Sequence, residues 1–125
     1  MSLMSSIVEI TAESFGARVL DSELPVLVAV CAEGCAASGR LLALLEQWIP
    51  KTAGRIRVVR VRATDTPELR RHGGITSAPG LLLFNRGAVS YQFLGEPARS
   101  ELDDLLAHTD FQVRADPAAQ RNGEL

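Results

Sequence analysis

The residues of this chain best suited to chemistry are two cysteines, Cys31 and Cys35, within residues 28–40. Cys35 follows a β-branched apolar run and precedes a stretch with helical spacing, so we expect its thiol at the first turn of a helix. Unpaired backbone N–H groups and the positive end of the helix dipole favour a thiolate there and lower the pKa of the thiol. Cys35 is therefore predicted to be a nucleophile.

Ser38 stands three residues after Cys35, where a dithiol redox motif carries its second cysteine. One thiol can attack a disulfide, but it cannot by itself release the mixed disulfide that results. Two interpretations of Ser38 are open: its hydroxyl could hydrogen-bond the Cys35 sulfur and help to lower the thiol pKa, or it could be a structural hydroxyl near a helix start.

Cys31 also has two interpretations. Cysteine is a common buried apolar residue, and Cys31 ends an apolar run, which favours a role in packing. Alternatively, Cys31 is a second thiol that pairs with Cys35 in an unusual Cys-x-x-x-Cys couple. That pairing requires the two Cα atoms to approach within ~4.4–6.8 Å.

The composition narrows the possible classes of function. The chain has 125 residues, 46% of them hydrophobic, which fits one domain with a buried core. A formal net charge of −2 argues against a dedicated nucleic-acid binder. The longest apolar run, residues 24–32, is shorter than the roughly 20 residues that span a bilayer. The cysteines and the two histidines, His72 and His108, show no zinc spacing, so no metal site is predicted.

The ends of the chain are predicted to lie outside the domain. Residues 1–6 lack the basic start and the apolar stretch of an export signal, which predicts a cytoplasmic, reducing location. Met4 is a candidate natural start, which would make residues 1–3 an added extension. The domain is expected to cover residues 7–108, and residues 109–125 are expected to form a C-terminal tail.

Strand and helix patterns alternate along the domain. β-branched and apolar runs predict strands, and apolar residues at helical spacing between capping signals predict helices. The strands are expected at residues 7–10, 25–31, 56–61, 81–84 and 89–94, the last two joined by a tight turn. The helices are expected at residues 12–20, 36–49, from Pro67 to the glycine pair at 73 and 74, and from Pro97 onward.

This order, with a cysteine at the second helix and a proline before the fourth strand, resembles thioredoxin over roughly residues 7–108. Ala32-Glu33 before Cys35 is similar to the family's Ala-Glu-Trp-Cys segment. Residues 77–79 resemble its Ile-Pro-Thr segment, and residues 85–87 its Lys-Asn-Gly turn. The resemblance implies an α/β, thioredoxin-like three-layer sandwich: a mixed four- or five-stranded sheet with helices on both faces.

The departures from the family pattern gather around the nucleophile. Ser38 replaces the resolving cysteine, which makes the site a Cys-x-x-Ser variant of the Cys-x-x-Cys motif. Ala29 replaces the buried aspartate that the family uses to move protons to and from the resolving thiol. The departures around the nucleophile are Ala29, Cys31, Gly34, Ala36, Ala37, Ser38 and Arg60.

The resemblance also implies a substrate-binding edge. Pro79 is expected to follow a cis peptide after Ala78, a feature that in this family holds a backbone edge beside the cysteine, where an extended substrate pairs. Gly80 replaces the usual threonine and is expected to leave that edge bare. Together with Gly34, which precedes the nucleophile, these residues are the predicted substrate-binding set.

The favoured function is that of a monothiol, thioredoxin-like oxidoreductase. Cys35 attacks disulfides, Pro79 and its neighbours present a client protein, and an external thiol such as glutathione acts as co-substrate and resolves the adduct. No cofactor, nucleic acid or membrane partner is expected. The alternative is a redox-inactive binding or chaperone-like module that holds a partner protein in the same groove or along the edge at Gly80.

Overall fold

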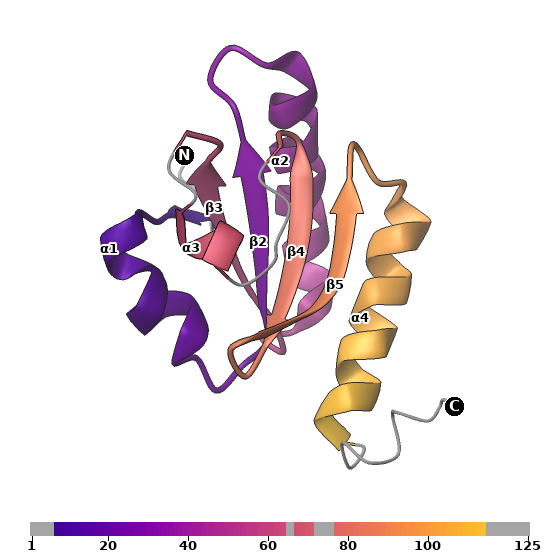
Figure 1. The fold of residues 1–125 in the computed structure, drawn as a ribbon. Coiled ribbons are helices and arrows are strands. Elements are labelled where there is room, and N and C mark those ends of the chain that lie inside the picture. Colours follow the sequence, from indigo (N-terminus) through magenta and orange to yellow (C-terminus); the bar gives the residue numbers. More distant parts are fainter. Residues whose placement is uncertain (1–6, 65–66, 72–76, 115–125) are drawn as a thin grey trace.

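A computed structural model describes residues 7–64, 67–71 and 77–114, with the backbone alone described at Glu68 and at residues 107–114. The strands are β1 (Val8–Glu9), β2 (Val26–Cys31), β3 (Arg57–Arg62), β4 (Gly80–Asn85) and β5 (Ala88–Leu94). The helices are α1 (Ala12–Phe15) continuing as η1 (Gly16–Leu20), α2 (Ala36–Trp48) continuing as η2 (Ile49–Thr52), α3 (Pro67–Arg71) and α4 (Arg99–Arg114). The chain order of strands and helices is the predicted one (Figure 1).

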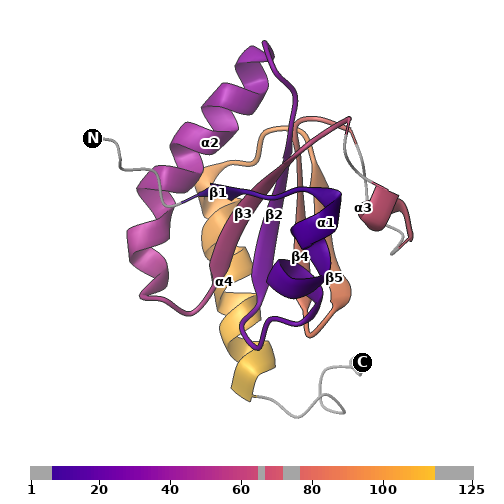
Figure 2. The same ribbon diagram turned by 90° about the vertical axis from the view of Figure 1, so that its left-hand side faces the viewer.

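The strands form one mixed sheet with the order β1-β3-β2-β4-β5. β2 runs parallel to β3 and antiparallel to β4, and it lies between them. Figure 2 shows α2 and α4 on one side of the sheet and α1 and α3 on the other. The predicted three-layer α/β sandwich is therefore confirmed, with five strands.

The central strand β2 is apolar because both of its faces are covered. Val26 to Val30 have no exposed surface. Alternate residues point to opposite faces of a strand, so Leu27 and Ala29 pack with the residues of α2 and α4, while Val28 and Val30 pack with those of α1. A continuous apolar run is the pattern expected of such a strand, and this explains why the sequence predicted it well.

The helix that opens the domain changes geometry halfway. The Thr11 N–H donates to Ser14 Oγ at 3.0 Å at the start of α1. From Gly16 the chain adopts a π-helical turn, η1, closed by a hydrogen bond from the Asp21 N–H to the Gly16 carbonyl at 2.9 Å. The predicted end at Leu20 is correct, although the pattern gave no sign of the π turn.

The β4–β5 hairpin turns where the sequence predicted it. Asn85 pairs with Ala88, and the two residues between them, Arg86 and Gly87, have φ of 54° and 84°. This left-handed pair is the geometry of a type I′ turn, which matches the twist of the flanking strands. A Cβ atom at Gly87 would also lie 3.3 Å from the Leu20 carbonyl oxygen, so two reasons favour glycine there.

The structure differs from the prediction at Gly80 and at the end of the last helix. Gly80 was expected to leave a bare edge, but this is wrong: Gly80 is buried, and it pairs with Val30 on one side and Leu94 on the other, because β4 is an inner strand. α4 continues to Arg114, past the predicted boundary after residue 108. Apolar residues at helical spacing predict the part of a helix that packs against a core, and this spacing fades near residue 108. The helix can continue further, because propagation requires only residues that tolerate the helical conformation. The glycines at 73 and 74 and residues 115–125 lie outside the described residues.

Candidate functional site

Cys35 lies at the N-cap of α2, in the extended conformation with φ −94° and ψ 114°. Its N–H donates to the Ala32 carbonyl at 3.2 Å, which closes the turn between β2 and the helix. The Ser38 N–H donates to the Cys35 sulfur at 3.4 Å, so the sulfur takes the place of the hydroxyl or carboxylate oxygen that usually caps a helix. The predicted position at the helix start is the one observed.

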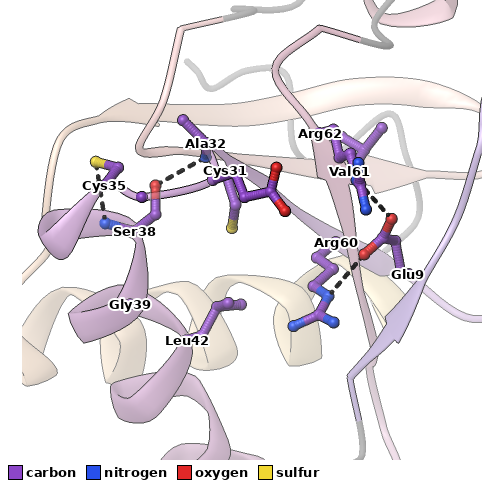
Figure 3. Close-up of a pocket in the computed structure, with 12 residues that line it drawn as sticks. Glu9, Cys31, Ala32, Cys35, Ser38, Gly39, Leu42, Arg60, Val61 and Arg62 are labelled. Atoms are coloured by element: carbon purple, nitrogen blue, oxygen red, sulfur yellow. Dashed lines mark hydrogen bonds and ion pairs between the residues drawn. The ribbon is translucent and has the colours of Figure 1, made fainter.

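Ser38 connects this sulfur to the end of the strand. The side chain is buried, and its hydroxyl oxygen accepts a hydrogen bond from the Ala32 N–H at 3.0 Å (Figure 3). The pKa of Cys35 is lowered from its ordinary value, first by the hydrogen bond from the Ser38 side chain and then by the Ser38 backbone. The Ala37 backbone and the charge of Arg40 act in the same direction, and partial burial opposes them.

The second thiol, Cys31, has the opposite character. It ends β2, is half-buried, and its burial raises the pKa to about 11, although the positive charge of Arg60 works against that rise. A weak contact joins the Cys31 sulfur to the Ala29 carbonyl oxygen at 3.9 Å. Both cysteines are free thiols, and their pairing stays a prediction. Cys31 is thus protonated at neutral pH, whereas the surroundings of Cys35 shift its equilibrium towards the thiolate.

A pocket of about 340 Å³ opens between the start of α2 and strand β3. Figure 3 shows the Cys31 sulfur pointing into the space between Leu42 and Arg60. The lining residues are Glu9, Cys31, Ala32, Glu33, Gly34, Cys35, Ser38, Gly39, Leu42, Arg60, Val61 and Arg62. Both cysteines, Ser38 and the predicted Gly34 therefore share one cavity.

Charged residues form the wall of this pocket on the β3 side. Arg62 Nε donates to Glu9 Oε2 at 2.9 Å, and Arg60 Nε lies 3.5 Å from Glu9 Oε1. Within the described residues, Arg60 Nε makes no hydrogen bond. The parallel register places Glu9 beside Arg60 and Arg62 beside Cys31, which explains how residues so far apart in sequence meet.

Apart from Gly34, which lines the pocket, the predicted substrate-binding residues lie on the other side of β2. The Ala78–Pro79 peptide bond is cis, and the Pro79 carbonyl accepts a hydrogen bond from the Gly95 N–H at 2.8 Å. Because Gly80 pairs with Val30, Pro79 lies at the level of the next β2 residue, Cys31. Ala78 and Pro79 are partly exposed, so the edge available to a substrate begins before β4 rather than at Gly80.

Two charged groups beside the site were missed at the level of sequence. Arg40, in the second turn of α2, makes two hydrogen bonds of 2.9 Å to Glu96, which follows β5. The second missed group is Glu9, which forms ion pairs with both arginines of the pocket. Only the strand order, which pairs β1 with β3, identifies Glu9 as the partner of Arg60 and Arg62.

The described residues contain no group of three His, Cys, Asp or Glu side chains that could hold a metal ion. His72 lies outside the described residues, and the side chain of His108 is not described. In the same part of the chain, no helix combines the length and the apolar character needed to cross a membrane.

A mixed sheet between two helical layers, with a thiolate-favouring cysteine where the central strand meets a helix, defines a class of small α/β proteins for thiol–disulfide redox chemistry. The family model described as Thioredoxin matches residues 6–108, and the chain belongs to the thioredoxin family.

Curated relatives agree with this assignment. The chain is 36% identical to Thioredoxin C-2 of Corynebacterium nephridii over 100 residues, which cover 80% of this chain and 93% of the relative. It is 32% identical to the thioredoxin of Synechocystis sp. (strain PCC 6803) over 82% of this chain and 96% of the relative. Thioredoxin 1 of Nostoc sp. (strain PCC 7120) is 29% identical over the same shares.

Proposed function

We propose that this protein performs thiol–disulfide exchange with Cys35 as its single nucleophile. The observation that carries the proposal is the contrast between its two thiols. Hydrogen bonds from Ser38 lower the pKa of Cys35, whereas burial raises the pKa of Cys31 to about 11. Since the thiolate is the attacking species, only Cys35 is prepared for attack at neutral pH.

The reaction proceeds in three thiol–disulfide exchanges, the last of which regenerates the Cys35 thiolate. The Cys35 thiolate attacks one sulfur of a client disulfide, so a Cys35–client disulfide forms and the other client sulfur leaves as a thiolate. An external thiolate then attacks the Cys35 sulfur and displaces the client, which leaves a mixed disulfide between Cys35 and the external thiol. A second external thiol attacks that adduct, restores the Cys35 thiolate and departs as a disulfide. In sum, two external thiols are oxidised and one client disulfide is reduced.

Glutathione is the external thiol proposed, and a protein disulfide is the proposed client. The family membership supports a disulfide substrate, and the partly exposed Ala78 and Pro79 offer an edge against which an extended client segment can lie. A cytoplasmic location belongs to the same proposal, because a reducing compartment supplies the external thiol.

The proposal is tested by adduct formation with glutathione disulfide. Intact-mass measurement should find one glutathione on the wild-type protein, one on Cys31→Ala and none on Cys35→Ala. Turnover of a small disulfide substrate should then require reduced glutathione and be lost in Cys35→Ala. Absence of an adduct on Cys35 in a folded wild-type protein would contradict the proposal and support the redox-inactive binding module instead.

A further inference from the structure

The pocket beside Cys35 has a chemistry that the exchange at Cys35 alone does not use. It has two arginines on one wall, an apolar residue, Leu42, on another, and the nucleophile at its rim. These groups bear on which thiol enters the pocket, an inference that rests on the proposed function.

The sheet order separates two approaches to Cys35. β2 carries the chain to the nucleophile, and its two neighbours lie on opposite sides: β4, which follows the Ala78–Pro79 segment, and β3, which carries Arg60 and Arg62. Figure 1 shows β3 and β4 on opposite sides of β2. The proposed client edge is therefore on the β4 side, and the pocket, which Arg60, Val61 and Arg62 line, is on the β3 side.

Thiol–disulfide exchange is an in-line displacement, in which the attacking sulfur, the central sulfur and the leaving sulfur lie close to one line. If the client sulfur sits on the β4 side of Cys35, the sulfur that displaces it from Cys35 must approach from the opposite side. That side holds the pocket, which Cys35 itself helps to line.

The charges of the pocket indicate what the approaching thiol carries. Arg60 and Arg62 share one carboxylate, Glu9, so the β3 wall has one positive charge in excess. The second carboxylate of the lining, Glu33, lies on the segment before Cys35. Within the described residues it forms no ion pair with these arginines, so the selectivity for a carboxylate depends on the β3 wall alone. Arg62 uses its Nε for Glu9, and 59% of its side chain is exposed, so the side chain stays accessible to a ligand. A guanidinium binds carboxylates in a fork geometry with two parallel hydrogen bonds, which gives it selectivity for that group.

The size of the pocket suits a small peptide rather than a protein segment. Its volume of about 340 Å³ is at the lower end of the range of ligand sites, roughly 300–1,000 Å³. Arg62 pairs in register with Cys31, which lies four residues before Cys35. A thiol bound to Cys35 can therefore reach Arg62 only if its carboxylate lies several bonds from its sulfur.

We propose that this pocket binds a low-molecular-weight peptide thiol with a free carboxylate, with Arg62 and Arg60 as the carboxylate-binding residues. The bound thiolate attacks the Cys35 sulfur, a disulfide between Cys35 and the small thiol forms, the bond to the client breaks, and the client sulfur leaves with the electron pair.

The test compares one thiol with and without its carboxylates. Cys35 is first converted to its mixed disulfide with thiopyridine by reaction with dithiodipyridine. Peptide mass spectrometry checks that the thiopyridine group is on Cys35. Release of thiopyridine is then followed by absorbance with glutathione and with its diethyl ester, each rate being divided by the rate of the same thiol with free dithiodipyridine. We expect glutathione to be about fivefold faster than the ester, the factor given by one partly exposed ion pair.

Three variants locate the effect. Arg62→Gln should reduce the preference for glutathione to near one, and Arg62→Lys should keep part of it. Arg57→Gln removes the same charge from the same strand but outside the pocket, so it should keep the full preference. The preference should also fall as salt is added.

The outcomes separate this inference from the proposed function. If Cys35 takes up thiopyridine but the acid and ester react alike, or if Arg57→Gln loses the preference as fully as Arg62→Gln, the pocket assignment is overturned and exchange at Cys35 stands. If Cys35 in the folded protein takes up no thiopyridine, both are overturned.

Discussion

Arg40 binds Glu96 through two parallel hydrogen bonds, each 2.9 Å long, and so ties the start of α2 to the turn that follows β5. The neighbour of Glu96, Gly95, donates to the carbonyl of Pro79. The helix that carries the nucleophile and the segment proposed to hold the client are thus joined through one exposed ion pair. Exposed pairs contribute little to stability, so its consequence is electrostatic.

The pair should set the acidity of Cys35 in a predictable way. Arg40 lowers the pKa of Cys35 through its charge, and Glu96 neutralises that charge. Arg40→Gln should therefore raise the pKa of the Cys35 thiol, and Glu96→Gln should lower it. The pH dependence of alkylation by iodoacetamide measures both shifts. Arg99→Gln, which removes a charge that contacts Gln47 instead, is the matched control. Shifts of the same sign in Arg40→Gln and Glu96→Gln would be incompatible with this assignment.

Ser38→Ala should weaken both the site and the fold. The hydroxyl lowers the pKa of Cys35, so its loss should raise that pKa and slow alkylation at neutral pH. The Ala32 N–H loses its acceptor at 3.0 Å, and the free energy of unfolding should fall by about 1 kcal/mol. Urea unfolding and the pH profile of alkylation check the two effects. An unchanged profile would leave Ser38 with a structural role alone.

Ser38→Cys should supply the missing internal release. The backbone N–H of residue 38 lies 3.4 Å from the Cys35 sulfur, so a thiol at this position is close to the nucleophile. We expect the variant to form a disulfide between residues 35 and 38 and to discharge a bound client without added glutathione. Gel analysis of a trapped client adduct should show it persisting in the wild type and disappearing in the variant. Persistence in both would indicate that the new thiol is held out of reach.

Cys31 should make the folded protein sensitive to alkali. Its pKa is about 11 in the folded protein and 9.0 for an ordinary thiol, so the folded state holds the proton more tightly than the unfolded state. The stability that this provides is complete below pH 9 and is lost as the pH rises towards about 11. Urea titrations across that window should show a steeper loss of stability in the wild type than in Cys31→Ala. Equal slopes would show that Cys31 ionises equally well in both states.

The core should respond to truncation in the usual way for a close-packed sheet. Leu81 on β4 is fully buried between β2 and β5, so Leu81→Ala should lower the free energy of unfolding by about 3 kcal/mol. Leu94 on β5 is 61% exposed, and Leu94→Ala should change it by no more than about 0.5 kcal/mol. A large loss in the second variant would mean that the exposed end of β5 is covered in solution.

Local patterns predicted the fold because each main element has a local cause. β2 is apolar on both faces because it is the middle strand, and the hairpin turns at Arg86-Gly87 because both residues adopt positive φ. The position of Cys35 at a helix start follows from the same patterns. The π turn of η1 was not predictable, because the buried residues Phe15 and Val19 are four positions apart, a spacing that an α-helix also produces.

Contacts between distant segments were beyond local patterns. Glu9 meets Arg60 and Arg62 only because β1 pairs with β3, and the Arg40–Glu96 pair depends on how β5 ends beside α2. The error at Gly80 has the same origin: whether a residue lies on an edge depends on strand order, which no short stretch of sequence contains.

The complete burial of Val26 to Val30 has one more consequence. The fully buried part of the strand beneath the nucleophile ends at Val30, and residues 32–37 are all at least partly exposed. Apart from Gly34, the positions between the buried strand and Ser38 can therefore accept new side chains without a matching change in the core. Libraries randomised at positions 32, 33, 36 and 37, with Gly34 retained for its φ of 76° and Cys35 and Ser38 retained for the site, should yield folded proteins at high frequency. This domain is therefore a carrier on which thiol reactivity can be selected independently of folding.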